Sequence, residues 1–188
     1  DYLNNMMIEQ TSIPEVLLIT NKKFGDNRGW FSEVFRLSEF EKAIGGQYKF
    51  VQINESFSMH NILRGIHYQN PHPQGKLVRV VSGEVFDVAV DLRKNSPTFK
   101  QWVGVTLSAQ NGQQLWVPPG FGHGFYVTGE HAHFVYACTD YYSPQTEHCI
   151  AYDDPELDVK WPIISGKMPL VSEKDRKGKA FNDAIVFD

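Results

Sequence analysis

LRGIHYQNPHPQGKLVRVVSGEVFDVAVDLR, residues 63–93, contains the features from which the fold class of this chain can be inferred. It carries His67 in a short apolar run, then a turn rich in proline, glycine and asparagine, then two runs rich in β-branched residues. These two runs, residues 76–81 and 84–91, are separated by Ser82-Gly83. Such runs bounded by turn formers are typical of a hairpin in an all-β domain. We therefore predict two strands joined by a turn at Ser82-Gly83, with a reactive imidazole nearby.

Short apolar runs recur through much of the remaining sequence. From residue 48 to residue 127 they follow one another about every eight to twelve residues, which is the spacing of a sandwich or barrel. The further predicted strands lie at residues 15–20, 30–35, 50–56, 62–68, 102–107, 113–117, 125–127, 132–139 and 150–152. A capping-box spacing from Ser38 to Glu41 predicts one short helix that ends at Gly45-Gly46, and a second can start at Ser172. No linker or repeat interrupts the pattern, so we expect residues 1–188 to form one all-β domain.

Composition and charge limit the classes of protein to which the chain can belong. The formal net charge of −4 argues against a general nucleic-acid partner, and no apolar run approaches membrane-spanning length. Cys138 and Cys149 make no disulfide framework, and the chain shows no charged-then-apolar leader, so we expect a cytoplasmic location. Because the first residue is not Met, residues 1–5 are either native or a processing or cloning remnant.

The segment from Pro118 to His123 has the pattern P-x-G-x-x-H, which resembles the second motif of the cupin superfamily, a double-stranded β-helix jelly roll. The first cupin motif supplies two histidines and a glutamate to a metal. Here Gln69 follows His67 in place of the second histidine, and Lys76 stands where the glutamate would be. An ammonium group cannot bind a divalent cation, and a neutral amide is a poor substitute for imidazole. The resemblance therefore implies a jelly roll that works without a metal or other cofactor.

Chemistry without a metal must come from acids, bases and fixed charges in the barrel mouth. His67 is the obvious base there, because histidine exchanges protons near neutral pH. Lys76, if it faces the same cavity, can stabilise a developing oxyanion. Removing a proton from a carbon next to a carbonyl group needs both a base and a group that stabilises the oxyanion. Reprotonation from the opposite face needs an acid, for which Tyr136 is the candidate. These roles together indicate an epimerase.

Seven segments carry a closer resemblance and follow one another along nearly the whole chain. They are FGDNRGWF (24–31), FVQINES (50–56), LRGIHYQ (63–69), QGKLVRVVSGEVFDVAVDLRKNSPTF (74–99), LWVPPGFGHGF (115–125), TDYYSP (139–144) and YDDPELDVKWP (152–162). In content and order they resemble the dTDP-4-dehydrorhamnose 3,5-epimerase family. The resemblance implies a homodimeric jelly roll that converts dTDP-4-dehydro-6-deoxy-D-glucose to dTDP-4-dehydro-L-rhamnose. The two carbons inverted, C3 and C5, both lie next to the C4 ketone.

The resemblance also implies the residues that move protons. His67 would be the base, and the best match for its carboxylate partner is Asp175. Lys76 would contact the C4 oxygen, and Tyr136 would be the acid on the opposite face.

Substrate-binding residues follow from the same resemblance. Arg64, together with Arg28 of the partner subunit, would hold the diphosphate, since the guanidinium fork suits phosphate oxygens. The residues that would line the rest of the site are Phe24, Glu33, Gln52, Asn54, His123, Tyr141 and Glu147.

Several alternatives stay open on the sequence. Tyr141 and Tyr142 are rival acids, and Asp175 has the spacing of a helix cap with Ser172. A single-centre 5-epimerase would use nearly the same proton-transfer groups. A 3,4-ketoisomerase is disfavoured, because enzymes of that type look as though they use a histidine pair where this chain has Gln69. A non-catalytic sugar-binding cupin would have no need of the proton-transfer groups together.

Overall fold

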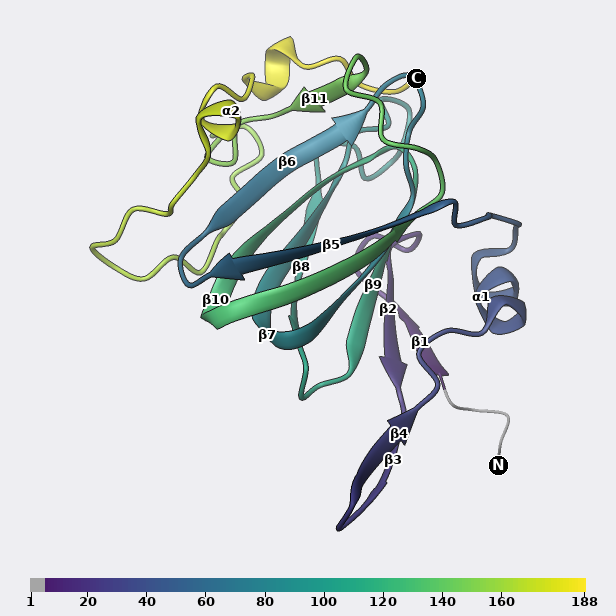
Figure 1. The fold of residues 1–188 in the computed structure, drawn as a ribbon. Coiled ribbons are helices and arrows are strands. Elements are labelled where there is room, and N and C mark those ends of the chain that lie inside the picture. The colour runs from purple at the N-terminus through teal and green to yellow at the C-terminus, as the bar shows by residue number, and fades with distance from the viewer. Residues whose placement is uncertain (1–5) are drawn as a thin grey trace.

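The computed structural model describes residues 6–188 and is built mainly from antiparallel strands (Figure 1). Residues 1–5, native or remnant, lie outside the described residues. The strands are β1 Met6–Gln10, β2 Leu17–Asn21, β3 Lys23–Asp26, β4 Gly29–Ser32, β5 Gln52–Met59, β6 Leu63–Gln69, β7 Lys76–Asp91, β8 Trp102–Ser108, β9 Gln113–Val117, β10 Phe121–Cys138 and β11 Glu147–Cys149. The short helices are α1 Leu37–Ile44, α2 Glu173–Arg176 and the 3-10 turn η1 Phe181–Asp183. The all-β prediction is confirmed.

Two long strands, β7 and β10, connect two layers of sheet. They pair with each other from Lys76 opposite Cys138 to Asp91 opposite Phe121. The first half of β7 also pairs with β9, and its second half with β8. Likewise, the first half of β10 pairs with β6 and the second half with β5. The first layer therefore contains β1, β2, β9 and β5, the second contains β8, β6 and β11, and the long strands run through both (Figure 1).

The predicted hairpin at Ser82-Gly83 is wrong, because β7 runs through this point as one strand of 16 residues. Gly83 marks the place where the strand changes layers, and its φ is +89°. A Cβ added here would lie 1.9 Å from the carbonyl oxygen of His131 on β10. Only glycine allows two backbones to approach so closely in this conformation. The glycine therefore signals a bend in a continuing strand.

Other local predictions were wrong in similar ways. The strands predicted at residues 125–127 and 132–139 are parts of the single strand β10, whose pairing register shifts between Val127 and Ala132. The last strand, predicted at 150–152, lies at β11 instead. Both predicted helices are present: α1 ends at Gly45 as expected, and α2 begins after Ser172. Only the start of α1 differs, because the helix begins after Arg36 and the capping box at Ser38 does not form.

Strand β5 reverses the usual burial pattern of a strand on an apolar core. The residues turned inward are polar, and they are Gln52, Asn54, Ser56 and Ser58. The residues turned outward are mostly apolar, and the exposed apolar ones are Ile53, Phe57 and Met59. A strand normally buries its apolar side. The inversion means that β5 lines a polar interior and presents an apolar outer surface.

Apolar side chains elsewhere form the core between and around the layers. The largest cluster draws on both layers and includes Val78, Val85, Leu107, Leu115, Phe125 and Phe134. None of the helices within residues 6–188 is long and apolar enough to cross a membrane.

Candidate active site

His67 is half-buried on β6, directly opposite His123 of β10 in the strand register. The two strands approach each other closely just before this pair. A Cβ at Gly65 would lie 2.6 Å from the Cα of Gly124, and Gly65 has a φ of +123°. Because only glycine tolerates that approach and conformation, the two glycines fix the point from which the imidazole projects.

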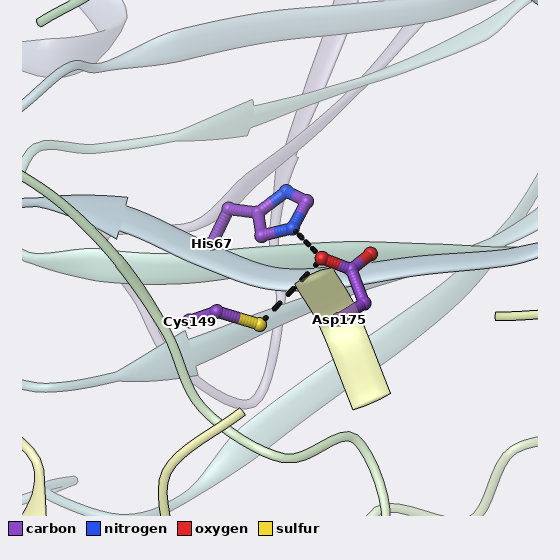
Figure 2. A group of neighbouring side chains, drawn as sticks. All are labelled: His67, Cys149 and Asp175. Carbon is purple, nitrogen blue, oxygen red and sulfur yellow. Dashed lines mark hydrogen bonds and ion pairs between the residues drawn. The ribbon is translucent and has the colours of Figure 1, made fainter. Parts of the chain in front are cut away.

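Asp175 holds one nitrogen of this imidazole (Figure 2). Its Oδ1 lies 2.6 Å from Nε2 of His67, and its Oδ2 accepts the backbone N–H of Gly65 at 3.0 Å. Burial tends to raise the pKa of Asp175, but its hydrogen bonds and its attraction to His67 outweigh burial and hold the pKa below the ordinary value. Since Nε2–H donates to a carboxylate, the lone pair of the neutral ring lies on Nδ1.

The backbone of Asp175 is fixed as well as its carboxylate. Its N–H donates to the side chain of Ser172, which is the N-cap of α2. The sequence left open whether Asp175 belongs to a helix cap or faces the histidine. The two roles use different atoms, and the residue has both contacts.

Cys149, on β11, is the third side chain of this group (Figure 2). Its Sγ lies 3.7 Å from Oδ1 of Asp175 and donates its proton there. Burial, followed by the nearby carboxylates of Asp175 and Glu147, raises the pKa of Cys149 to about 12. The side chain is therefore a thiol at neutral pH.

A narrow cavity joins His67 to Lys76, the first residue of β7. Its walls include the side chains of His67, Gln69, Gln74, Lys76 and His123. Burial lowers the pKa of Lys76, while Cys138, Asp87 and Glu147 act in the opposite direction. His67 and Lys76 thus line the same cavity, although they come from different layers.

Tyr136 lies next to Lys76 on the side of the first layer. The ammonium nitrogen of Lys76 is 5.6 Å from the centroid of the Tyr136 ring. Tyr136 is paired in register with Asn54 of β5. Burial raises the pKa of Tyr136, and a hydrogen bond with Asn54 and the charge of Arg64 oppose this rise. The phenol is therefore protonated at neutral pH and is available as an acid.

A second histidine–carboxylate pair lies deeper between the layers. Nε2 of His123 is 2.7 Å from Oδ1 of Asp87, and both side chains are buried. Burial raises the pKa of Asp87, and His123 and Lys76 act against that rise. Oδ2 of Asp87 has no hydrogen-bond partner among the described residues. Asp87 thus places a carboxylate charge close to the ammonium group of Lys76.

Glu147 belongs to a hydrogen-bonded group at the open end of the site. One of its oxygens accepts bonds of 2.6 Å from the Tyr142 hydroxyl and from Lys174. Burial tends to raise the pKa of Glu147, but these bonds and the nearby His67 hold it below the ordinary value. Tyr142 is therefore the tyrosine of the TDYY segment that contacts this group, whereas the Tyr141 side chain is 63% exposed.

Gln52 and Arg64 lie on the strands that enclose the same space. Gln52 donates to Asn54 at 3.0 Å and accepts the N–H of Tyr142 at 3.1 Å. Arg64, on β6, donates from Nε to Ser58 at 3.0 Å and leaves the rest of its guanidinium exposed. Helix α2 and the strands therefore bring together nine of the thirteen side chains chosen from the sequence, and of Tyr141 only the backbone carbonyl, which accepts from Gln69, contacts the group.

The remaining three, Phe24, Arg28 and Glu33, lie on or just after the hairpin of β3 and β4. This hairpin projects from the layers, away from β6 (Figure 1). Arg28 pairs with Asp26 at 2.6 Å, and Glu33 pairs with Arg36 at 2.7 Å. A single chain does not bring these three residues to His67.

Sequence reasoning missed Asp87, Cys149 and Lys174, which contact the chosen residues. Asp87 and Cys149 each stand alone in a strand with no motif spacing, and Lys174 is one of several charged residues in the C-terminal segment. Only the inward alternation of β7 could have singled out Asp87, because an acidic residue at a core position needs a partner.

The described side chains suit one kind of chemistry. Nδ1 of His67 can take a proton from a carbon next to a carbonyl group, and Lys76 can stabilise the enolate oxygen. Tyr136 can return a proton from a different direction. These three functions are the ones that an epimerisation through an enolate requires.

Comparisons with known proteins agree with this geometry. A sequence model of the dTDP-4-dehydrorhamnose 3,5-epimerase family matches residues 10–183. The dTDP-4-dehydrorhamnose 3,5-epimerase of Pseudomonas aeruginosa is 53% identical over 182 residues, which cover 97% of this chain and 99% of that protein. The dTDP-6-deoxy-D-glucose-3,5-epimerase of Legionella pneumophila Philadelphia 1, solved in complex with dTDP-4-keto-L-rhamnose, has a TM-score of 0.90 and 50% identity, covering 94% of this chain and 93% of that one.

More distant relatives share the architecture. ChmJ, a 3'-monoepimerase of Streptomyces bikiniensis solved with dTDP-quinovose, has a TM-score of 0.86 and 32% identity, covering 93% of this chain and 87% of that one. The cupin-like jelly roll expected from the sequence is confirmed. From its sequence over nearly its whole length and from its fold, the chain belongs to the dTDP-4-dehydrorhamnose 3,5-epimerase family.

Proposed function

We propose that this protein epimerises C3 and C5 of dTDP-4-dehydro-6-deoxy-D-glucose, giving dTDP-4-dehydro-L-rhamnose for dTDP-L-rhamnose biosynthesis. The observation that carries the proposal is the His67–Asp175 pair, with its 2.6 Å contact, together with the cavity that His67 and the half-buried Lys76 both line. Family membership and the dTDP-sugar complexes of similar structures support a nucleotide-sugar substrate.

The mechanism follows from the positions of the three proton-transfer groups. Nδ1 of His67 takes the proton from C3 or C5, and the electron pair of the C–H bond moves to the C4 oxygen as an enolate. Lys76 stabilises that oxygen with its charge. Tyr136 then donates its proton to the same carbon from the opposite face, which inverts the centre. Exchange with water then removes the proton from His67 and returns one to the Tyr136 phenolate, so that base and acid are both restored before the next step.

The charge on Lys76 is needed for this role. Burial lowers the pKa of Lys76, and the Asp87 carboxylate acts against that change. We infer that the His123–Asp87 pair keeps a negative charge next to the ammonium group. An uncharged amine would stabilise an enolate much less, because the stabilisation is electrostatic.

We further propose a homodimer in which the β3–β4 hairpin of one subunit completes the site of the other. The hairpin carries Trp30 and Phe31 at 64% and 70% exposure, next to Phe24 and Arg28. The exposed apolar residues on β5 form a second apolar surface. Large exposed apolar patches mark contact surfaces in soluble proteins. In the dimer, Arg28 would reach the partner's diphosphate together with that subunit's own Arg64.

The proposal needs no metal, and the side chains at the two substituted cupin positions support this. Gln69 donates from Nε2 to the carbonyls of His72 and Tyr141 and accepts the N–H of Ser143. Its amide is therefore committed to the backbone, and Lys76 carries the wrong charge for a cation site. Enzyme dialysed against EDTA should retain full activity; recovery of a lost activity by added metal would contradict a cofactor-free mechanism.

The free thiols of Cys138 and Cys149 are consistent with the proposed reducing, cytoplasmic location.

The test is incubation with dTDP-4-dehydro-6-deoxy-D-glucose in D2O, followed by NMR of the sugar. We expect deuterium at both C3 and C5. Deuterium at one carbon would support a single-centre epimerase, the activity for which ChmJ is named. No deuterium would contradict the proposal and favour a binding protein. Lys76→Met is the matched variant: it keeps the stem, removes the charge, and should slow exchange by about 10²- to 10³-fold.

A further inference from the structure

The group of His67, Cys149 and Asp175 has a second chemical capacity that epimerisation does not use (Figure 2). One ring nitrogen of His67, the Sγ of Cys149 and a carboxylate oxygen of Asp175 all lie within 4.8 Å of one another. The three side chains come from β6, β11 and α2, so the strands and the helix hold them together. Imidazole, thiolate and carboxylate are the ligands that proteins use for Zn²⁺.

We propose that His67, Cys149 and Asp175 form a zinc site behind the imidazole, and that Zn²⁺ bound there reversibly inactivates the enzyme. The inactivation rests on the proposed role of His67 as the base, whereas the binding of the metal does not. This site differs from the cupin metal position, where Gln69 and Lys76 replace two ligands.

The two separations that involve the Asp175 oxygen can be compared with those around a tetrahedral ion. With Zn–S near 2.3 Å and Zn–O near 2.1 Å, tetrahedral geometry places sulfur and oxygen about 3.6 Å apart. The observed distance from Sγ to Oδ1 is 3.7 Å. The same geometry places nitrogen and oxygen about 3.4 Å apart, whereas Nε2 and Oδ1 are now 2.6 Å apart in a hydrogen bond. The imidazole and carboxylate must therefore separate by a fraction of an ångström.

The surroundings hold the Asp175 ligand in place. Oδ2 of Asp175 accepts the N–H of Gly65, and the Asp175 backbone is fixed by Ser172. The ordering of ligands by such outer contacts is a regular feature of protein metal sites. Binding also requires the Cys149 proton to leave for solvent, so that the sulfur binds as a thiolate. Three protein ligands leave the fourth position to water.

Proton accounting explains why the bound metal would stop catalysis. In the metal-free pair, Nε2 carries the ring proton and Nδ1 carries the lone pair. Zn²⁺ on Nε2 moves that proton to Nδ1, and the nitrogen that should take a proton from the substrate becomes a donor. The metal lies on the Asp175 side of the ring, so the nucleotide can still bind. Inhibition should therefore lower kcat and leave KM nearly unchanged.

The experiment uses the full-length enzyme in a phosphate-free and thiol-free buffer. Added Zn²⁺ should lower kcat at least tenfold, and EDTA should restore it. Co²⁺ without nucleotide should give a thiolate-to-cobalt absorption band in the near ultraviolet. Cys149→Ser, which keeps the shape of the side chain, should lose the band and need at least about tenfold more Zn²⁺ for half inhibition. Cys138→Ser, at the other free thiol, should behave as wild type.

Each outcome bears on one part of the proposal. Inhibition of Cys149→Ser at wild-type Zn²⁺ concentrations, a cobalt spectrum without a thiolate band, or an effect on KM alone would overturn the site. Cys149→Ala with the same sensitivity as wild type would do so as well. A Cys149-dependent band with undiminished turnover would leave the site standing and contradict the role of His67 as base.

Discussion

At the residue scale, Asp175 connects the helix α2 to the chemistry of His67. Asp175→Asn should lower kcat by about 10²- to 10⁴-fold, because an amide can present its NH2 group to Nε2 and stabilise the wrong tautomer. Affinity for dTDP should stay near the wild-type value, since no proposed nucleotide contact is removed. Steady-state kinetics and calorimetry measure the two effects.

Ser172→Ala is the matched control for Asp175→Asn. It removes the helix cap bond to the Asp175 N–H and should destabilise the fold by about 1 kcal/mol. The Asp175 carboxylate remains in this variant, so turnover should fall by much less than in Asp175→Asn. Equal losses of kcat in the two variants would contradict a role for the carboxylate beyond holding the helix.

The lowered pKa of Asp175 predicts a pH dependence of stability. A carboxyl group whose pKa is lower in the folded chain stabilises that chain above its unfolded pKa, about 3.9. This contribution decreases as the pH falls towards and through the lower folded pKa. The stability difference between wild type and Asp175→Asn, measured by urea unfolding, should be present at pH 7 and shrink below about pH 4. A difference that stays constant or grows below about pH 4 would contradict the lowered pKa of Asp175.

Tyr136 is the proposed acid on the face opposite His67. Tyr136→Phe keeps the ring beside Lys76 and removes only the acidic proton. Product formation should fall by about 10²-fold or more, whereas some deuterium should still enter the substrate, because base and ammonium group remain. NMR of recovered substrate and product in D2O measures product formation and deuterium entry separately. Unchanged product formation would assign the acid to another group, with Tyr142 next in line.

At the element scale, the bend in β7 allows one chain to supply both sides of the site. Gly83→Ala would place a Cβ 1.9 Å from the His131 carbonyl oxygen at a φ of +89°. We expect a loss of about 3 kcal/mol or more, measured by urea unfolding. Gly46→Ala, where a Cβ meets nothing within 4 Å, should change stability by less than about 1 kcal/mol. Similar stabilities for both variants would contradict the bend.

The same element shows what could be predicted from sequence. Apolar alternation located most strands, because burial of one face leaves a period-two pattern. Gly83 was read as a turn, since a glycine that relieves a backbone contact and one that reverses the chain look alike in sequence. The close backbone contact of Gly83 is with His131, almost fifty residues away, and a local sequence pattern cannot reveal it.

The residues of the candidate site were predicted from resemblance to a family rather than from local sequence pattern. His67, Lys76, Tyr136 and Asp175 were found through resemblance to a family, and the fold brings His67 to Asp175 and Lys76 to Tyr136. Spacing along the chain contains no such information, because the His67–Asp175 contact spans 108 residues. Cys149 had no sequence signal at all, and only three-dimensional proximity reveals it.

At the scale of the whole molecule, the outer face of β5 predicts the assembly. Phe57→Glu, at a position 60% exposed, should weaken the proposed dimer and yield monomer at low micromolar concentration. Leu37→Glu, at an exposed apolar position on α1, is the control and should leave the mass unchanged. Light scattering coupled to size exclusion measures both. A stable dimer in the Phe57 variant would place the contact elsewhere.

The hairpin residue Arg28 tests whether the partner completes the site. Arg28→Ala should raise KM for the nucleotide sugar by about tenfold or more, because a charge-assisted contact to phosphate is lost. Its ion partner Asp26 provides the comparison: Asp26→Ala frees the guanidinium and should have a smaller effect. An unchanged KM in Arg28→Ala would contradict the proposed contact across subunits.

Solvent deuterium entry at C3 and C5, measured with His67→Asn, tests most directly whether His67 is the base at both carbons. The imidazole is proposed to take both protons, so exchange at both carbons should fall by about 10²- to 10⁴-fold while dTDP still binds. His72→Asn, an exposed histidine in the neighbouring loop, should exchange like wild type. Exchange at either carbon at the wild-type rate in His67→Asn would show that a different base acts there and would contradict the account.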